Sequence, residues 1–167
     1  MPATRTCRLI EELHLAYDGE PWHGPSITQL LAGVSAAQAE ARPAADVHSI
    51  AEIVAHVTSW VAEVHRRVQG HPATDPVEGD WPVPRSLNET GWASMRLALT
   101  NAMARLTESV AGFPERRWDD RVGDVRNAAL GTGMTYQQTV LGLVHHLAYH
   151  GGQIAILKKL AADRLGP

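Results

Sequence analysis

The sequence has few of the features that mark secreted, membrane-spanning or nucleic-acid-binding proteins. Among its 167 residues Cys7 is the single cysteine, so an intramolecular disulfide is impossible and a cytoplasmic location is expected. No apolar run approaches the roughly 18 residues of a membrane span, and the N-terminus lacks the apolar core of a signal peptide. The net charge of −3 offers no basic surface to a polyanion. We therefore expect no membrane and no nucleic acid among its partners.

The chain also lacks the alternating pattern of β-strands, internal repeats and a phosphate-binding glycine loop. Instead, apolar residues recur at helical spacing, in segments that open with Ser or Thr followed three residues later by Gln or Glu. Such a pair forms a capping box, which satisfies free backbone N–H groups at the start of a helix. The four pairs are Ser26 with Gln29, Ser49 with Glu52, Ser86 with Glu89, and Thr135 with Gln138.

These patterns predict four long helices, one short helix and two long connections. The long helices are expected over residues 5–17, 49–69, 87–111 and 135–160, and the short one follows Ser26. Residues 33–47 are expected to be a connection, and the long connections are residues 70–85 and 112–134. The sequence thus predicts an all-α fold, a four-helix bundle with long crossover connections, in a single domain over residues 1–167.

Nine histidines are many for this length, and two of them occupy related positions on the last predicted helix. His150 falls within the apolar arc of that helix, His146 falls on its edge, and His145 points to solvent. Residues four apart lie one turn above each other, so both imidazoles can reach one metal ion. The pair supplies two ligands and needs a third from elsewhere. Ordinary helix packing is the alternative interpretation of both residues.

A third histidine lies on the second long predicted helix. His56 is on the flank of its apolar stripe, between Ile53 and Trp60, one turn away on either side. A neighbouring helix that approached this flank would bring further ligands to it. Glu52 and Glu63 share the flank, either as additional metal ligands or as solvated surface residues.

Taken together, these residues resemble the DinB/YfiT-like superfamily of metal-binding four-helix bundles. The resemblance rests on His56 within SIAEIVAHVTSW, on His146 and His150 within HHLAYHGGQI, and on the turn WHGPS at residues 22–26. It implies a divalent metal, commonly zinc or nickel, held by His56, His146 and His150, with the remaining positions open to water or substrate. Gln153 is expected to support the ligands rather than to coordinate. The resemblance also implies a homodimer.

The same family includes thiol-dependent bacterial enzymes, namely bacillithiol S-transferases and mycothiol-dependent maleylpyruvate isomerases. The resemblance therefore implies a metal-dependent enzyme that acts on a small-molecule substrate. Activation of a low-molecular-weight thiol for transfer is the first reaction predicted, and hydrolysis by activated water is the second. Trp22, His23 and Trp60 are candidates for the wall of a substrate cavity. A non-catalytic metal-binding protein, with Glu52 or Glu63 as fourth ligand, and a metal-free interaction protein remain the alternatives.

Overall fold

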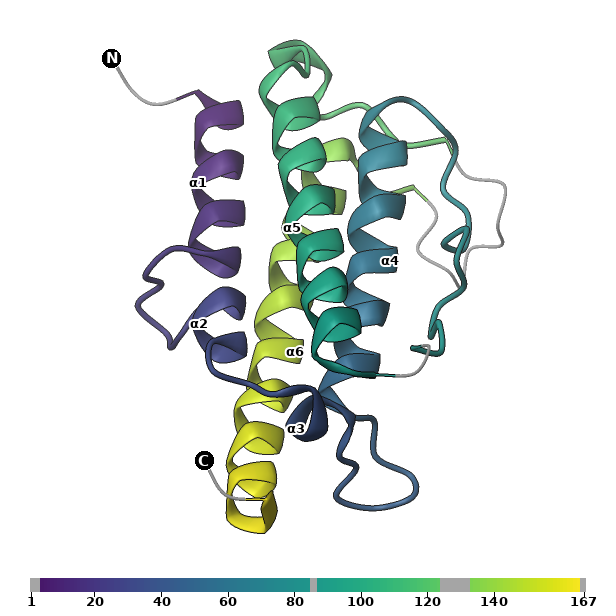
Figure 1. The fold of residues 1–167 in the computed structure, drawn as a ribbon. Coiled ribbons are helices and arrows are strands. Elements are labelled where there is room, and N and C mark those ends of the chain that lie inside the picture. The colour runs from purple at the N-terminus through teal and green to yellow at the C-terminus, as the bar shows by residue number, and fades with distance from the viewer. Residues whose placement is uncertain (1–3, 85–86, 124–132, 166–167) are drawn as a thin grey trace.

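The computed structural model describes residues 4–84, 87–123 and 133–165. Helices account for nearly all of the regular structure in these ranges, and one isolated β-bridge joins Arg121 to Thr135. The helices are α1 (Arg5–Tyr17), α2 (Ile27–Leu31), α3 (Ala36–Glu40), α4 (Ile50–Val68), α5 (Glu89–Ala111), the short 3₁₀ turn η1 (Glu115–Arg117) and α6 (Tyr136–Leu165) (Figure 1).

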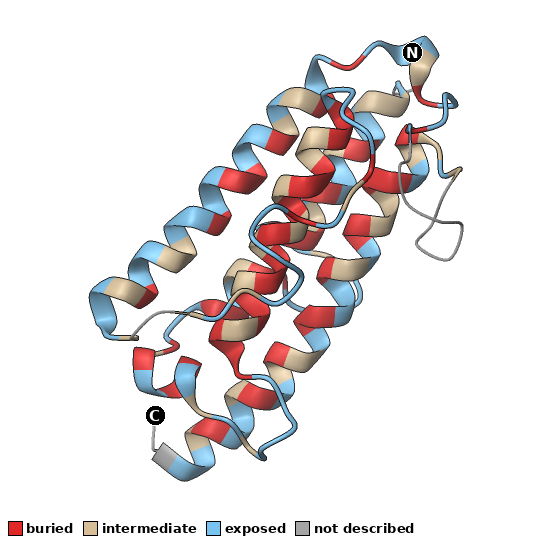
Figure 2. Ribbon diagram, turned by 90° about the vertical axis from the view of Figure 1, so that its right-hand side faces the viewer, coloured by how far each residue is buried: buried red, intermediate tan, exposed pale blue. Residues whose placement is uncertain are grey.

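The four long helices α1, α4, α5 and α6 pack side by side as a bundle. α1 and α6 run in one direction, and α4 and α5 run in the other (Figure 1). α4 packs against α5 and α6, while α1 packs against the same two helices from the other side. Their apolar faces meet in the interior, where the buried residues of each helix gather (Figure 2). The all-α bundle predicted from the sequence is confirmed.

The connection between α4 and α5 is long because these neighbouring helices are parallel. The 19 residues of α4 rise about 28 Å along the axis. An extended chain covers about 3.3 Å per residue, so the return needs at least about nine residues. Residues 69–88 provide this length, and the described part, residues 69–84, runs back along the side of the bundle (Figure 1). We call this segment the crossover loop.

Gly70 allows the chain to leave α4 and enter the crossover loop. Its φ of +94° lies in the left-handed region, which a residue with a side chain rarely adopts. The backbone N–H groups of Gly70 and His71 donate to the carbonyls of Arg67 and Arg66 at 2.8 and 3.1 Å. These bonds satisfy the last carbonyls of α4 and fix the direction in which the loop departs.

The structure corrects the predictions for residues 33–47 and for the start of α5. Residues 33–47 are not only a connection, because α3 forms there with Ser35 and Gln38 as a capping box. Five residues are too few to show helical periodicity, although the S-x-x-Q signal is present. α5 starts at Glu89 with Asn88 as its cap, and Ser86 lies outside the described residues. The Glu89 carboxylate instead accepts from the Ala36 N–H at 2.8 Å, which joins the starts of α5 and α3.

The predicted capping box at the start of α6 is confirmed. The Thr135 hydroxyl accepts from the Gln138 N–H at 3.1 Å, and the Gln138 side chain accepts from the Thr135 N–H at 2.9 Å. α6 extends to Leu165, five residues beyond the predicted end. In the described part of the chain, no helix combines the length and apolar character needed to cross a bilayer.

Candidate metal centre

Three histidines from two helices meet inside the bundle. His56 comes from the middle of α4, and His146 and His150 come from successive turns of α6. His56 and His150 are buried, and His146 is half-buried. One ring nitrogen from each histidine lies within 4.8 Å of the other two. The arrangement arises because α4 and α6 pack in contact, which brings together residues 90 apart in sequence.

Two of the three imidazoles are held in a defined tautomer. The Nδ1 atom of His56 lies 2.6 Å from the carbonyl oxygen of Asp80, and Nδ1 of His150 lies 2.6 Å from Oε1 of Gln153. A carbonyl oxygen only accepts hydrogen bonds, so each Nδ1 carries the proton and donates. Nε2 of each ring is then left with a free lone pair, which is the state that binds a metal.

The spacing of the ring nitrogens fits a metal ion. Nε2 of His56 and Nε2 of His146 are 2.9 Å apart. Zinc–nitrogen bonds of about 2.05 Å place two ligand nitrogens about 2.9 Å apart at a right angle and about 3.3 Å apart at a tetrahedral angle. The observed spacing falls at the lower end of this range. The His56 and His146 nitrogens therefore already have a spacing that suits one divalent ion, and the ring nitrogens of all three histidines lie within 4.8 Å of one another.

The electrostatic environment keeps these imidazoles neutral. Burial, together with the neighbouring His150 and His56, lowers the pKa of His146 from 6.5 to about 4. Burial also lowers the pKa of His56 and of His150, although hydrogen bonds to Asp80 and Gln153 oppose the shift. Because protonation competes with metal binding, the depressed pKa values favour the ligating form at neutral pH.

The crossover loop covers the histidine group and contributes residues that the sequence pattern did not identify. The Trp81 ring stacks on His56 at a centroid distance of 3.9 Å and on His48 at 3.7 Å. The Asp80 carboxylate accepts from Nε1 of Trp60 at 2.7 Å and lies 3.3 Å from Nδ1 of His56. The crossover loop has no periodic sequence pattern. The sequence therefore does not predict which of its residues lie against α4.

The candidate cavity residues occupy two different environments. Trp60 lies beside the histidines, with its ring centroid 6.4 Å from that of His56 and 6.2 Å from that of His146. Trp22 is 97% exposed and contacts the ring of His23, which is exposed as well. The turn between α1 and α2 directs both side chains to solvent, so the predicted cavity wall does not form there.

The two glutamates considered as further ligands are bound to other groups. The Glu52 carboxylate accepts from the Ser49 N–H at 2.9 Å and pairs with Arg42. Glu63 is only 1% exposed, which corrects the expectation of a solvated residue. Its carboxylate accepts from Arg67 and from the Thr74 N–H, each at 2.9 Å. Gln153 binds His150 through its amide oxygen, as expected of a residue that supports a ligand.

Comparison with known proteins agrees with this geometry. Residues 23–154 match the family model of the DinB superfamily, which covers most of the chain and all three histidines. The chain therefore belongs to the DinB superfamily. A search of curated proteins and a search of solved structures found no match.

Proposed function

We propose that this protein is a metal-dependent enzyme in which His56, His146 and His150 hold one zinc or nickel ion. The observation that carries the proposal is the convergence of three imidazoles, of which one ring nitrogen each lies within 4.8 Å of the other two. Three protein ligands are the number found in catalytic metal sites, where the remaining position takes water or substrate. Glu52 and Glu63 are bound elsewhere, which argues against a closed, purely structural site.

The side chains around the ligands have distinct roles in this proposal. When bound, the metal acts as a Lewis acid that lowers the pKa of a thiol or of water. The Asp80 carbonyl and the Gln153 amide hold the protons of His56 and His150 on Nδ1, so that both Nε2 atoms stay available. Trp60 and Trp81 shield one side of the ligands from solvent, which strengthens electrostatic interactions there.

Transfer of a low-molecular-weight thiol is the first reaction that we propose. The thiolate sulfur forms a bond to an electrophilic carbon of a small-molecule substrate, the leaving group departs with its bonding electron pair, and the thiol proton passes to solvent. Hydrolysis is the second, with water in place of the thiol. Superfamily membership supports this choice. We further propose a cytoplasmic homodimer in which residues 1–167 form one domain.

Metal analysis of the untagged protein tests the site. We expect about one divalent ion per chain after incubation with zinc or nickel, and loss of that ion in His150→Ala. The matched control is His145→Ala, because His145 is on the same helix but exposed. A parent protein that stays metal-free, or a His145→Ala variant that loses metal equally, would contradict the proposal. Turnover that requires an added thiol would then separate transfer from hydrolysis.

A further inference from the structure

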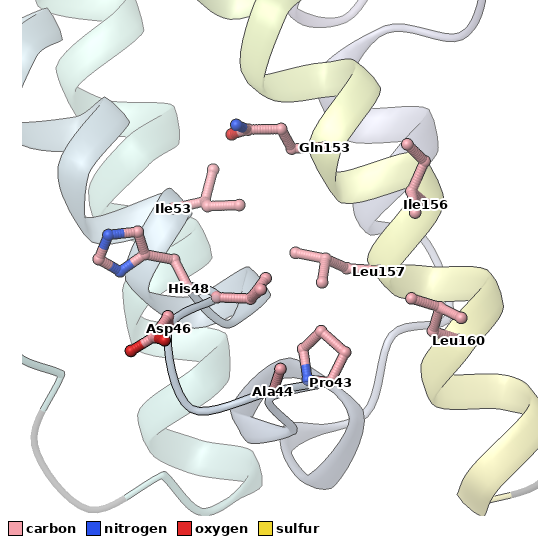
Figure 3. A pocket seen from close by; sticks show the side chains of 10 residues that line it. Pro43, Ala44, Asp46, His48, Ile53, Gln153, Ile156, Leu157 and Leu160 are labelled. Carbon is pink, nitrogen blue, oxygen red and sulfur yellow. The ribbon is translucent and has the colours of Figure 1, made fainter.

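An apolar groove lies next to the histidine group, between α4, α6 and the segment that precedes α4. It encloses about 560 Å³, a size typical of small-molecule sites. Ile53 and Gln153 lie at one end, and Pro43 and Leu160 lie at the other (Figure 3). Gln153 and Leu160 are seven residues apart on α6, so the groove runs for about 10 Å along that helix.

One end of the groove is separated from the three histidines by a single layer of side chains. Gln153 lines it and also accepts the hydrogen bond from Nδ1 of His150. His48 lines the rim of the groove and stacks on Trp81, and Trp81 also stacks on the ring of His56. The groove is therefore linked to His150 through Gln153, and to His56 through His48 and then Trp81. A molecule lying in it can extend its end toward the ligands.

The lining favours an uncharged apolar occupant. Ile53 and Leu157 form a buried floor, and Ile156, which is 62% exposed, contributes to the open side. Among the lining residues, which all belong to the described part of the chain, none is Lys or Arg. Asp46 is the one carboxylate among them, and it would repel an anionic chain. The buried apolar floor and the lack of a cation among these lining residues favour a hydrocarbon portion over a phosphate or carboxylate along the groove.

We infer that this groove binds the uncharged, apolar tail of the small-molecule substrate, with the reacting end of that molecule directed to the three histidines. The inference rests on the proposed function, because it assigns the groove to the substrate of the same metal centre. The substrate class is a molecule that has a polar reacting group at one end and a hydrocarbon portion about 10 Å long at the other. The groove would select the substrate, and the metal centre would act on it.

A series of n-alkyl hydroxamic acids tests the inference on the zinc-loaded protein. The hydroxamate group binds zinc, and the alkyl chain probes the groove. Affinity measured by calorimetry should rise by up to about fourfold for each added methylene, and should level off once the chain reaches the Leu160 end. A chain of equal length that ends in a carboxylate should lose most of this gain.

Two exposed apolar residues provide a matched pair of variants. Ile156→Glu places a charge on the groove wall and should remove most of the dependence on chain length. Leu97→Glu is the control, because Leu97 on α5 is 59% exposed and lies outside the groove, whereas Ile156 is 62% exposed. Metal content and thermal unfolding are measured for each variant. Both should retain zinc and fold as the parent does.

The outcomes separate the inference from the proposed function. Bound zinc with no dependence on chain length overturns the inference and leaves the metal centre intact. A protein that binds no metal overturns both, because the groove then serves no reacting centre. If sedimentation shows that Ile156→Glu dissociates a dimer while the chain-length dependence is unchanged, a second copy covers this face and the inference is wrong.

Discussion

The proposed metal centre is built from two regions that differ in how they are specified. α4 and α6 supply the three candidate ligands from positions fixed by helical spacing, and both helices pack through continuous apolar faces. The crossover loop has no regular structure over Asp80 and Trp81, yet it supplies the carbonyl and the ring that orient His56. The helices bring the three histidines together, whereas the crossover loop determines the tautomer of His56.

The largest expected effect concerns the attachment of the loop to α4. Glu63→Gln removes the charge that pairs with buried Arg67 and weakens the contact with Thr74 at the start of the loop. Because an unpaired buried charge is left behind, we expect the free energy of unfolding to fall by about 3 kcal/mol in urea denaturation. Metal content should stay at about one ion per chain. Loss of metal without loss of stability would instead identify Glu63 as a ligand.

The next effect tests the support that comes from a helix. Gln153→Leu removes the acceptor that holds the proton of His150 on Nδ1. Metal affinity, measured by competition with a chelator, should fall by about 10- to 100-fold. Gln153→Glu is the control, since a carboxylate accepts the same hydrogen bond and should keep the affinity close to that of the parent. Equal affinities for all three proteins would show that the hydrogen bond does not matter to the site.

A smaller effect tests the support that comes from the loop. Trp81→Ala removes the ring stacked on His56 and should weaken metal binding by about fivefold, because such aromatic contacts contribute about 1 kcal/mol. Trp22→Ala is the matched control, since Trp22 is 97% exposed and its described ring contact is with His23. If both variants bind metal as the parent does, the helices alone determine the geometry of the ligands.

The last effect is a pH dependence of the metal-free protein. In the unfolded chain His146 titrates near 6.5, and in the folded chain its pKa is lowered to about 4. Below pH 6.5 the unfolded chain therefore binds a proton that the folded chain does not. Stability should be complete above pH 6.5 and should fall as the pH drops toward 5. Urea denaturation with a chelator present measures this slope, and His146→Gln should flatten it; an unchanged slope would contradict the assignment.

The sequence allowed much of the helical framework to be predicted, because capping boxes and apolar spacing are local signals. These signals located α1, α4 and α6, and they placed His146 and His150 on the inner side of α6. They failed where the structure depends on contacts between distant segments. The start of α5 is tied to α3 through Glu89 and Ala36, and no local pattern indicates that contact.

The same distinction applies to the site. His56 lies on the flank of its helix by spacing alone, and its burial follows from packing against α6 and from coverage by the crossover loop. Trp22 is of a residue type that often lines cavities, yet its side chain is exposed to solvent. Neither the burial of His56 nor the exposure of Trp22 can be predicted from neighbouring residues. Each depends on the position that a loop without regular backbone structure adopts in the folded chain.

The separation of the ligands in sequence has a consequence for biosynthesis. His56 and His146 are 90 residues apart, and the α6 pair is the last part of the centre to be made. At about 5–20 residues per second, a ribosome adds those residues in roughly ten seconds. During that interval the nascent chain presents a single isolated histidine of the three. If the three histidines hold a metal as proposed, the complete ligand set exists only after α6 has been made and has docked against α4.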